Sequence, residues 1–185
     1  MSLKSSATAG RANAHRLVRI TTFGFLALAM LLVHRAAEAV DGCMVILCLA
    51  APKWREVPMC VPVIHQLHRD LARGRPFPVC NTAGPNNWTE NTWASAPGNC
   101  PEHYTRLVEG PNRPMPVCDY AGVVTVYVNG APFTRTWWNA DADSVTEFTP
   151  AAKAQLGTWD PKFDDDHALW LALQPPPPPA CPPLC

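Results

Sequence analysis

Three signatures are missing from this 185-residue chain after residue 39, and each absence argues against a class of protein. No Cys-x-x-Cys pair occurs, which argues against a thiol oxidoreductase and against paired zinc knuckles. No Gly-x-Ser-x-Gly turn occurs, so a serine hydrolase with its nucleophile on such a turn is not indicated. Lys and Arg form no basic patch, which argues against nucleic acid as the partner, because phosphate neutralisation needs clustered cations.

The first 39 residues have the features of a secretory signal peptide. Basic residues precede an apolar run from Ile20 to Val33, and Ala37-Glu38-Ala39 presents small residues at the two positions that signal peptidase reads. The run is shorter than the roughly 20 residues that cross a bilayer as a helix, so cleavage is favoured over a permanent membrane anchor. We expect residues 1–39 to be removed before Val40, with membrane contact only through the uncleaved signal.

The exported part is expected to be mildly acidic and rich in disulfides. Removing five of the fifteen basic and one of the fifteen acidic residues leaves ten and fourteen, a net charge of −4. All eight cysteines lie after residue 39, and an even number confined to the exported part predicts disulfides over a metal site. Their pairing stays open. The cysteines expected to form four intramolecular disulfides are Cys43, Cys48, Cys60, Cys80, Cys100, Cys118, Cys181 and Cys185.

Residues 40–174 are expected to form one small domain with several short helices. The apolar segment Cys43–Ala50 fits either a buried strand or a buried helical turn. Met59–Arg73 has the spacing of an amphipathic helix, with Cys60, Val63, Ile64, Leu67 and Leu71 on its buried face. Capping residues and prolines predict further helices at 101–110, 149–157 and 160–173.

One β-hairpin is expected from Gly122 to Trp138. Both halves are rich in β-branched and aromatic residues, and Asn129-Gly130 between them suits a type I′ turn. The polar stretch Pro78–Asn99 has the composition of a loop. Five consecutive prolines begin an extended tail over residues 175–185, which ends in the last cysteine pair. The expected fold class is therefore α+β, mainly helical, with one hairpin and a proline-rich C-terminal tail.

Candidates for catalysis or metal binding are few. His65 and His68 have the spacing of a shared metal site, with Asp70 nearby. Two imidazoles on the helix surface are the favoured interpretation, with His68 at the border of the buried face. His167 follows three aspartates, Asp164 to Asp166, which lack the glycine and alternating ligands of a calcium loop. We expect these aspartates to form a solvated first helical turn, where negative charge suits the helix dipole. A glycan hydrolase needs two carboxylates facing a cleft, and nothing singles out a pair among Glu90, Glu102 and Glu109. We therefore assign no catalytic residue, no metal site and no cofactor.

Tryptophan is the strongest indication of a binding surface. All seven tryptophans follow residue 39, and this side chain is enriched at protein contacts, although it also fills sparse cores. Trp137 and Trp138 are adjacent on the expected strand, so their side chains point to opposite faces. One of the two is expected to be buried and the other exposed or covered by the loop. The expected partner-binding residues are Trp88, Trp93, Trp137 and Trp138.

The order of these features resembles the TrbM family of conjugal transfer proteins, also called KikA. The resemblance rests on the cysteine-bracketed segment Cys43–Leu49, on Cys60-Val-Pro at the start of a helix, and on the later Cys80 and Cys100-Pro. The hairpin end Thr134–Trp138 and the segment Trp159–Phe163 are also similar to the family. The resemblance covers most of residues 40–173, and it excludes the tail.

The resemblance implies a periplasmic protein of a Gram-negative donor cell that contacts type IV secretion or pilus components. The family has no catalytic residues to transfer, so the expected function is an accessory role in conjugative DNA transfer through protein–protein contacts, not an enzyme. The alternative is a small secreted hydrolase or cell-wall-acting enzyme.

Overall fold

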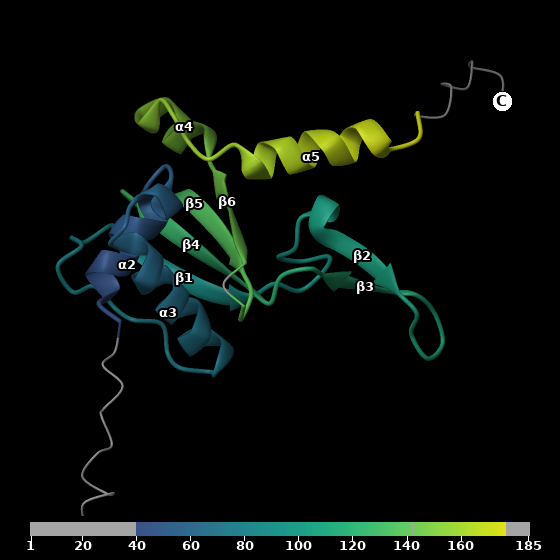
Figure 1. Ribbon diagram of the computed structural model, residues 1–185, viewed down its shortest axis with the longest axis horizontal. Coiled ribbons are helices and arrows are strands. Elements are labelled where there is room, and N and C mark those ends of the chain that lie inside the picture. Colours follow the sequence, from purple (N-terminus) through teal and green to yellow (C-terminus); the bar gives the residue numbers. More distant parts are fainter. Residues whose placement is uncertain (1–39, 142, 177–185) are drawn as a thin grey trace, which may run out of the picture. The chain divides into compact units, whose positions relative to one another are not determined.

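The computed structural model describes residues 40–141 and 143–176. The expected signal peptide lies outside these residues, as do Cys181, Cys185 and most of the expected proline tail. A four-stranded antiparallel sheet with strand order β1-β4-β5-β6 forms the centre of the described part (Figure 1). Its strands are β1 (Trp88–Trp93), β4 (Gly122–Val128), β5 (Ala131–Trp138) and β6 (Ser144–Phe148).

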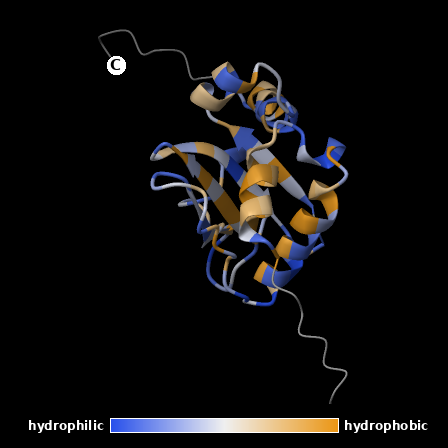
Figure 2. Ribbon diagram, turned by 90° about the vertical axis from the view of Figure 1, so that its left-hand side faces the viewer, coloured by the Kyte–Doolittle hydropathy of each residue, from blue (hydrophilic) through white to orange (hydrophobic). Residues whose placement is uncertain are grey.

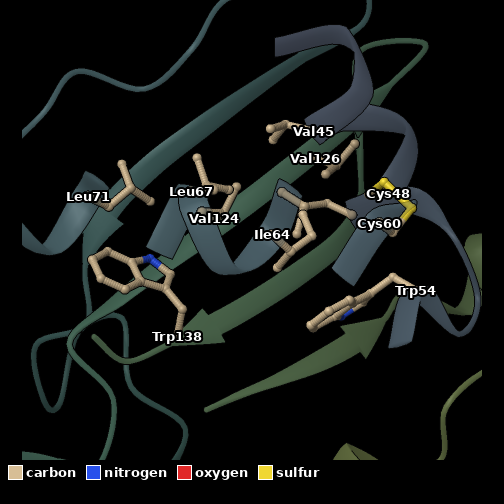
Figure 3. Packing of buried hydrophobic residues seen from close by; sticks show 11 residues of the cluster. Val45, Cys48, Trp54, Cys60, Ile64, Leu67, Leu71, Val124, Val126 and Trp138 are labelled. Atoms are coloured by element: carbon tan, nitrogen blue, oxygen red, sulfur yellow. A yellow bond between two sulfur atoms is a disulfide. The ribbon is translucent and has the colours of Figure 1, made fainter. Parts of the chain in front are cut away.

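Two helices cover the first face of this sheet. Helix α2 (Gly42–Ala50) is capped by Asp41, whose side chain accepts a hydrogen bond from the Cys43 amide, and α3 (Cys60–Ala72) follows the short 3₁₀ helix η1 (Trp54–Glu56). Apolar side chains of both helices pack against Val124 and Val126 of β4 and against Trp138 of β5 (Figure 3). Helix α2 is apolar along its whole length, whereas α3 also carries hydrophilic residues (Figure 2). The main core lies between the helix pair and the sheet.

The second face of the sheet is covered only in part. A 3₁₀ helix, η2 (Glu102–Tyr104), precedes a two-stranded antiparallel ribbon, β2 (Thr105–Val108) and β3 (Met115–Cys118). Tyr104 packs with Trp137 of β5 and Phe163 in a smaller core. Phe163 belongs to the last helix, and the C-terminal helices are α4 (Pro150–Leu156) and α5 (Lys162–Leu173).

Three disulfides join these elements within the described residues. Cys48–Cys60 links α2 to the first residue of α3, and Cys43–Cys80 links α2 to the segment after α3. Cys100–Cys118 ties the start of the η2 segment to β3. Six of the eight cysteines are therefore paired as disulfides, and the expected fourth bridge concerns cysteines outside the described residues. The three bridges are consistent with an oxidising location outside the cytoplasm.

Several predicted elements are confirmed. The helix at Met59–Arg73 forms as α3, with Cys60, Ile64, Leu67 and Leu71 buried, although Val63 is only half-buried. The two C-terminal helices form as α4 and α5. The hairpin forms with Asn129 and Gly130 both at positive φ, at 53° and 81°, as a type I′ turn requires. The segment Cys43–Ala50, for which the sequence allows strand or helix, is helical in α2.

The expectation of one hairpin is wrong, because the sheet content is larger. The presumed loop Pro78–Asn99 contains β1, which pairs with β4, and β6 was not anticipated. The helix expected at 101–110 is a single 3₁₀ turn that gives way to β2. Each missed strand pairs with a partner that local sequence does not reveal, and cross-strand contacts decide strand formation more than intrinsic preference does. The fold is α+β as expected, but a four-stranded sheet organises it, and the sheet content exceeds the one hairpin of the expected mainly helical domain.

Candidate functional site

The uncovered half of the second sheet face forms a polar cleft. One row of directly paired residues crosses all four strands, Glu90 on β1, Thr125 on β4, Arg135 on β5 and Glu147 on β6. Phe163 of α5 and the turn before η2 border this row and leave a cleft of about 480 Å³. The residues that line it are Glu90, Thr92, Gly98, Asn99, Cys100, Pro101, Val123, Thr125, Tyr127, Arg135, Trp137, Glu147 and Phe163.

Two carboxylates and one guanidinium give the cleft its charge. Burial raises the pKa of Glu147, and the nearby Arg135 guanidinium, 4.0 Å from its carboxylate, opposes that rise. At the other end of the row the Tyr127 hydroxyl donates a hydrogen bond of 3.4 Å to Glu90. Arg135 therefore balances Glu147, and Glu90 supplies the excess negative charge of the row. Sequence reasoning considered Glu90 but missed Arg135 and Glu147, because the row is created by strand pairing.

The two carboxylates of the cleft belong to the two outer strands of the sheet. Glu90 and Glu147 lie on the two outer strands of a four-stranded sheet, so three interstrand spacings of about 4.8 Å separate their backbones by roughly 14 Å. Carboxyl groups that act together in glycosidases lie about 5 to 9.5 Å apart. Glu102 and Glu109 are exposed outside the sheet, so none of the carboxylates considered from the sequence forms a pair with Glu90.

The four candidate partner-binding tryptophans divide into two groups. Trp137 and Trp138 point to opposite faces of β5, as expected, but both are buried, at 3% and 0% exposure. Each indole N–H is used inside the protein: Trp137 donates to the Asn99 carbonyl and Trp138 to the Asn91 side chain. The expectation that the second tryptophan is either exposed or covered by the loop is met in its second form, because Trp137 is covered at Asn99, the last residue of the expected loop Pro78–Asn99. Both therefore contribute to the core, not to a free surface.

Trp88 and Trp93 remain exposed and lie at the two ends of β1. Trp88 is 43% exposed and stacks on Tyr127 with 4.4 Å between ring centroids. Trp93 is 63% exposed, and its ring lies 6.3 Å from that of Trp138. Strand alternation places Trp88 on the cleft side together with Glu90, and Trp93 on the helix side. β1 thus presents an aromatic side chain at each end and on each face.

The histidine candidates do not converge on a metal. His68 is fully buried against Trp138, with 5.8 Å between ring centroids, so the interpretation of His65 and His68 as two surface imidazoles is wrong for His68. His65 lies edge-on to Trp54. Across residues 40–141 and 143–176, no three His, Cys, Asp or Glu side chains are arranged to hold a metal ion.

The acidic start of α5 has a structural role. The Asp164 carboxylate accepts hydrogen bonds from Lys153 and from the Trp159 indole. Asp166 accepts from the Tyr104 hydroxyl at 2.6 Å and from Lys162. These contacts hold α5 to α4 and η2, so the expectation of a solvated first turn is wrong for these two aspartates.

The other end of α5 is an exposed apolar segment. Leu169, Leu171 and Leu173 are 63%, 53% and 75% exposed, and no residue of α5 is fully buried. In Figure 1 this end of the helix extends beyond β6. Three exposed leucines within five residues suit a contact surface. Sequence analysis predicted this helix but did not assign it a role in binding.

Comparison with known proteins adds no assignment. Neither family models, nor curated proteins, nor solved structures provide a match to this chain. Within the part of the chain that the structure describes, no helix has the length and apolar character needed to cross a bilayer.

Proposed function

We propose that this protein is an exported accessory component of conjugative DNA transfer that works in the periplasm through contacts with type IV secretion or pilus proteins. The observation that carries the proposal is the α2–α3 pair. The cysteine-bracketed segment and the Cys60-Val-Pro helix start, which resemble the TrbM family, fold into two helices joined by the buried Cys48–Cys60 disulfide. Residues that carry the resemblance thus build the main core.

The exposed surface supports a role in binding. β1 presents Trp88 and Trp93 to solvent, and the end of α5 presents three exposed leucines. Tryptophan truncations at interfaces often cost 2 kcal/mol or more of binding free energy, whereas isolated exposed leucines contribute less. We therefore assign the main partner contact to the β1 side of the sheet.

The proposal is tested by deleting the gene from the mobile element and measuring transfer frequency. We expect transfer to fall while nicking of the DNA in the cytoplasm continues, and the wild-type gene should restore transfer. A gene with both Trp88→Ala and Trp93→Ala should fail to restore it. Leu107→Ala is the matched control, because Leu107 is 72% exposed on β2 away from the sheet. Unchanged transfer after deletion, in liquid and on solid medium, would contradict the proposal.

A wall-acting hydrolase is the second candidate, and the cleft favours it. The raised pKa of Glu147 suits a general acid, and Glu90 is the other carboxylate among the described residues that line the cleft. If the hydrolase assignment is correct, Glu147→Gln abolishes release of sugar or peptide fragments from purified cell wall. If the wild-type protein releases no fragments, the hydrolase assignment fails.

A further inference from the structure

The two outer strands of the main sheet are protected to different degrees. At β6, four of the five residues are buried, α4 and α5 pack against the strand, and the Arg55 guanidinium donates to the Ser144 carbonyl and hydroxyl. At β1, no residue is buried, and β4 is the one described helix or strand that contacts it extensively. The sheet therefore has one covered edge and one open edge.

β1 has few of the features that usually protect an open edge. Natural edge strands carry charged side chains, especially Lys, or Pro, are interrupted by bulges, or are very short. The sequence Trp-Thr-Glu-Asn-Thr-Trp has no Lys and no Pro, its one charged residue is Glu90, and its six positions pair with β4 without a register shift. Among the described residues, no backbone group of Thr89 to Thr92 has a hydrogen-bond partner outside β4. The outward-facing amides and carbonyls are thus free to pair with another extended chain.

The charge of Glu90 determines which kind of extended segment can pair with β1. It is the one charged residue of β1, it is exposed, and on the open side of the strand nothing described balances it. A second copy of β1 is a poor match. Two-fold antiparallel pairing centred on Glu90 places two carboxylates directly opposite, and pairing centred on Asn91 leaves them as diagonal neighbours, so both arrangements bring like charges together. A strand with a Lys or Arg opposite Glu90 instead gains an opposite-charge pair.

The aromatic residue beside Glu90 favours the same occupant. Trp88 lies two residues away on the same face, with its ring stacked on Tyr127 and 43% exposed. A Lys or Arg of an added strand that lies opposite Glu90 is a diagonal neighbour of the Trp88 indole. Cation–π attraction to this ring then adds to the ion pair with Glu90. Trp93, at the far end and on the other face, offers an apolar contact to a flanking side chain.

We propose that β1 is a strand-addition site that binds an extended segment of a protein partner, with a Lys or Arg of that segment opposite Glu90. The inference rests on the proposed function in one respect: the segment that pairs with β1 is taken to belong to a partner protein. The backbone of the segment completes a fifth strand, and the basic side chain fixes its register.

The test uses the full chain, exported and purified with its disulfides intact. A display library of random ten-residue peptides is panned against it, and the enriched sequence is synthesised with its basic residue and with Glu in that position. We expect enrichment of extended sequences with a central Lys or Arg. The Glu peptide should bind roughly two- to tenfold more weakly, because an opposite-charge cross-strand pair becomes a like-charge one. The Glu90→Lys variant should reverse this preference.

The control and the second readout locate the site. Glu109→Lys makes the same charge change at an exposed position outside the sheet and should leave the preference for the basic peptide unchanged. Amide hydrogen exchange at Thr89–Thr92 should slow when the basic peptide binds. A peptide methylated on alternate backbone nitrogens should lose both binding and protection.

Four results would each overturn the inference: no enrichment of basic sequences, an unchanged preference in Glu90→Lys, exchange protection away from β1, or dimerisation through β1 in light scattering. Failure of the proposed function gives a different pattern. If deletion leaves conjugative transfer unchanged but the peptide still binds β1, the role in conjugation fails and the strand-addition site stands.

Discussion

The largest polar side chain sealed in the main core is His68, and both of its ring nitrogens lack a hydrogen-bond partner among the described residues. Burial, together with the positive potential of His65 and Arg55, lowers its pKa from 6.5 to about 3. The folded protein therefore holds a neutral imidazole between α3 and Trp138. The unfolded chain releases the same ring to water, where it takes up a proton near its ordinary pKa.

This difference predicts acid sensitivity. Above pH 6.5 the imidazole is neutral in both states, and as the pH falls toward 3 only the unfolded state binds the proton, so stability is lost. The loss is about 1.4 kcal/mol per pH unit and about 5 kcal/mol in total. His68→Leu should flatten the dependence of urea unfolding on pH between 6.5 and 4. Ile64→Val, a change at another buried position of α3 that removes no titratable group, should keep the wild-type slope. An equally steep slope in His68→Leu would refute the explanation.

Gly122 shows how one residue permits the packing of another. A Cβ atom at this position would lie 2.5 Å from the indole of Trp138, which is fully buried and donates to Asn91. We predict that Gly122→Ala lowers the free energy of unfolding by about 1–3 kcal/mol, because the ring has to leave its position. Gly130→Ala is not a matched control, since Gly130 is at positive φ. Gly98→Ala, where the nearest atom would lie 3.6 Å away, should cost less, and equal losses would contradict the prediction.

At the scale of the elements, α2 and α3 are held by a bridge that is itself part of the core. Cys48 and Cys60 are 0% and 4% exposed, and twelve residue positions separate them. Cys43 and Cys80 lie nearer the surface and enclose a longer loop, with a separation of 37. Loop closure and side-chain packing therefore contribute in different proportions to the free energy with which each disulfide stabilises the fold.

Replacing each pair by alanine should separate these contributions. Loop closure alone predicts a loss of about 3 kcal/mol for Cys48→Ala with Cys60→Ala and about 4 kcal/mol for Cys43→Ala with Cys80→Ala. Removal of the buried pair adds the cost of a cavity, so we expect its loss to equal or exceed that of the outer pair in urea unfolding. A clearly smaller loss for the buried pair would show that packing of the sulfur atoms contributes little.

At the scale of the whole molecule, the chain needs its cross-links because the core is divided between two faces of the sheet and a smaller cluster under α4. The exported protein is predicted to lack one hydrogen for each of its eight cysteines relative to the fully reduced form. Intact mass before and after reduction measures this. The three bridges of the described part account for six hydrogens, and several free thiols in the exported protein would contradict the prediction.

Local sequence signals predicted the elements whose contacts join residues close together in the chain. Asn129-Gly130 determined the hairpin turn, the spacing of Cys60, Ile64 and Leu67 predicted α3, and Thr149-Pro150 located the start of α4. The candidate site was predicted only in part. Trp88, Trp93 and Glu90 were candidates from the sequence, but in a segment expected to be a loop. Arg135 and Glu147 were not among the candidate site residues.

The sequence by itself determined the even set of cysteines, the helical periodicity and the turn residues, because each depends on composition or on neighbours a few positions away. Only the tertiary structure decided that Trp88–Trp93 is an edge strand, that Trp137 and Trp138 are both buried, and that Glu90, Arg135 and Glu147 share one row. These facts depend on pairing between strands far apart in the chain. The energy of a strand comes from the partner beside it and the face it covers, which local sequence does not specify.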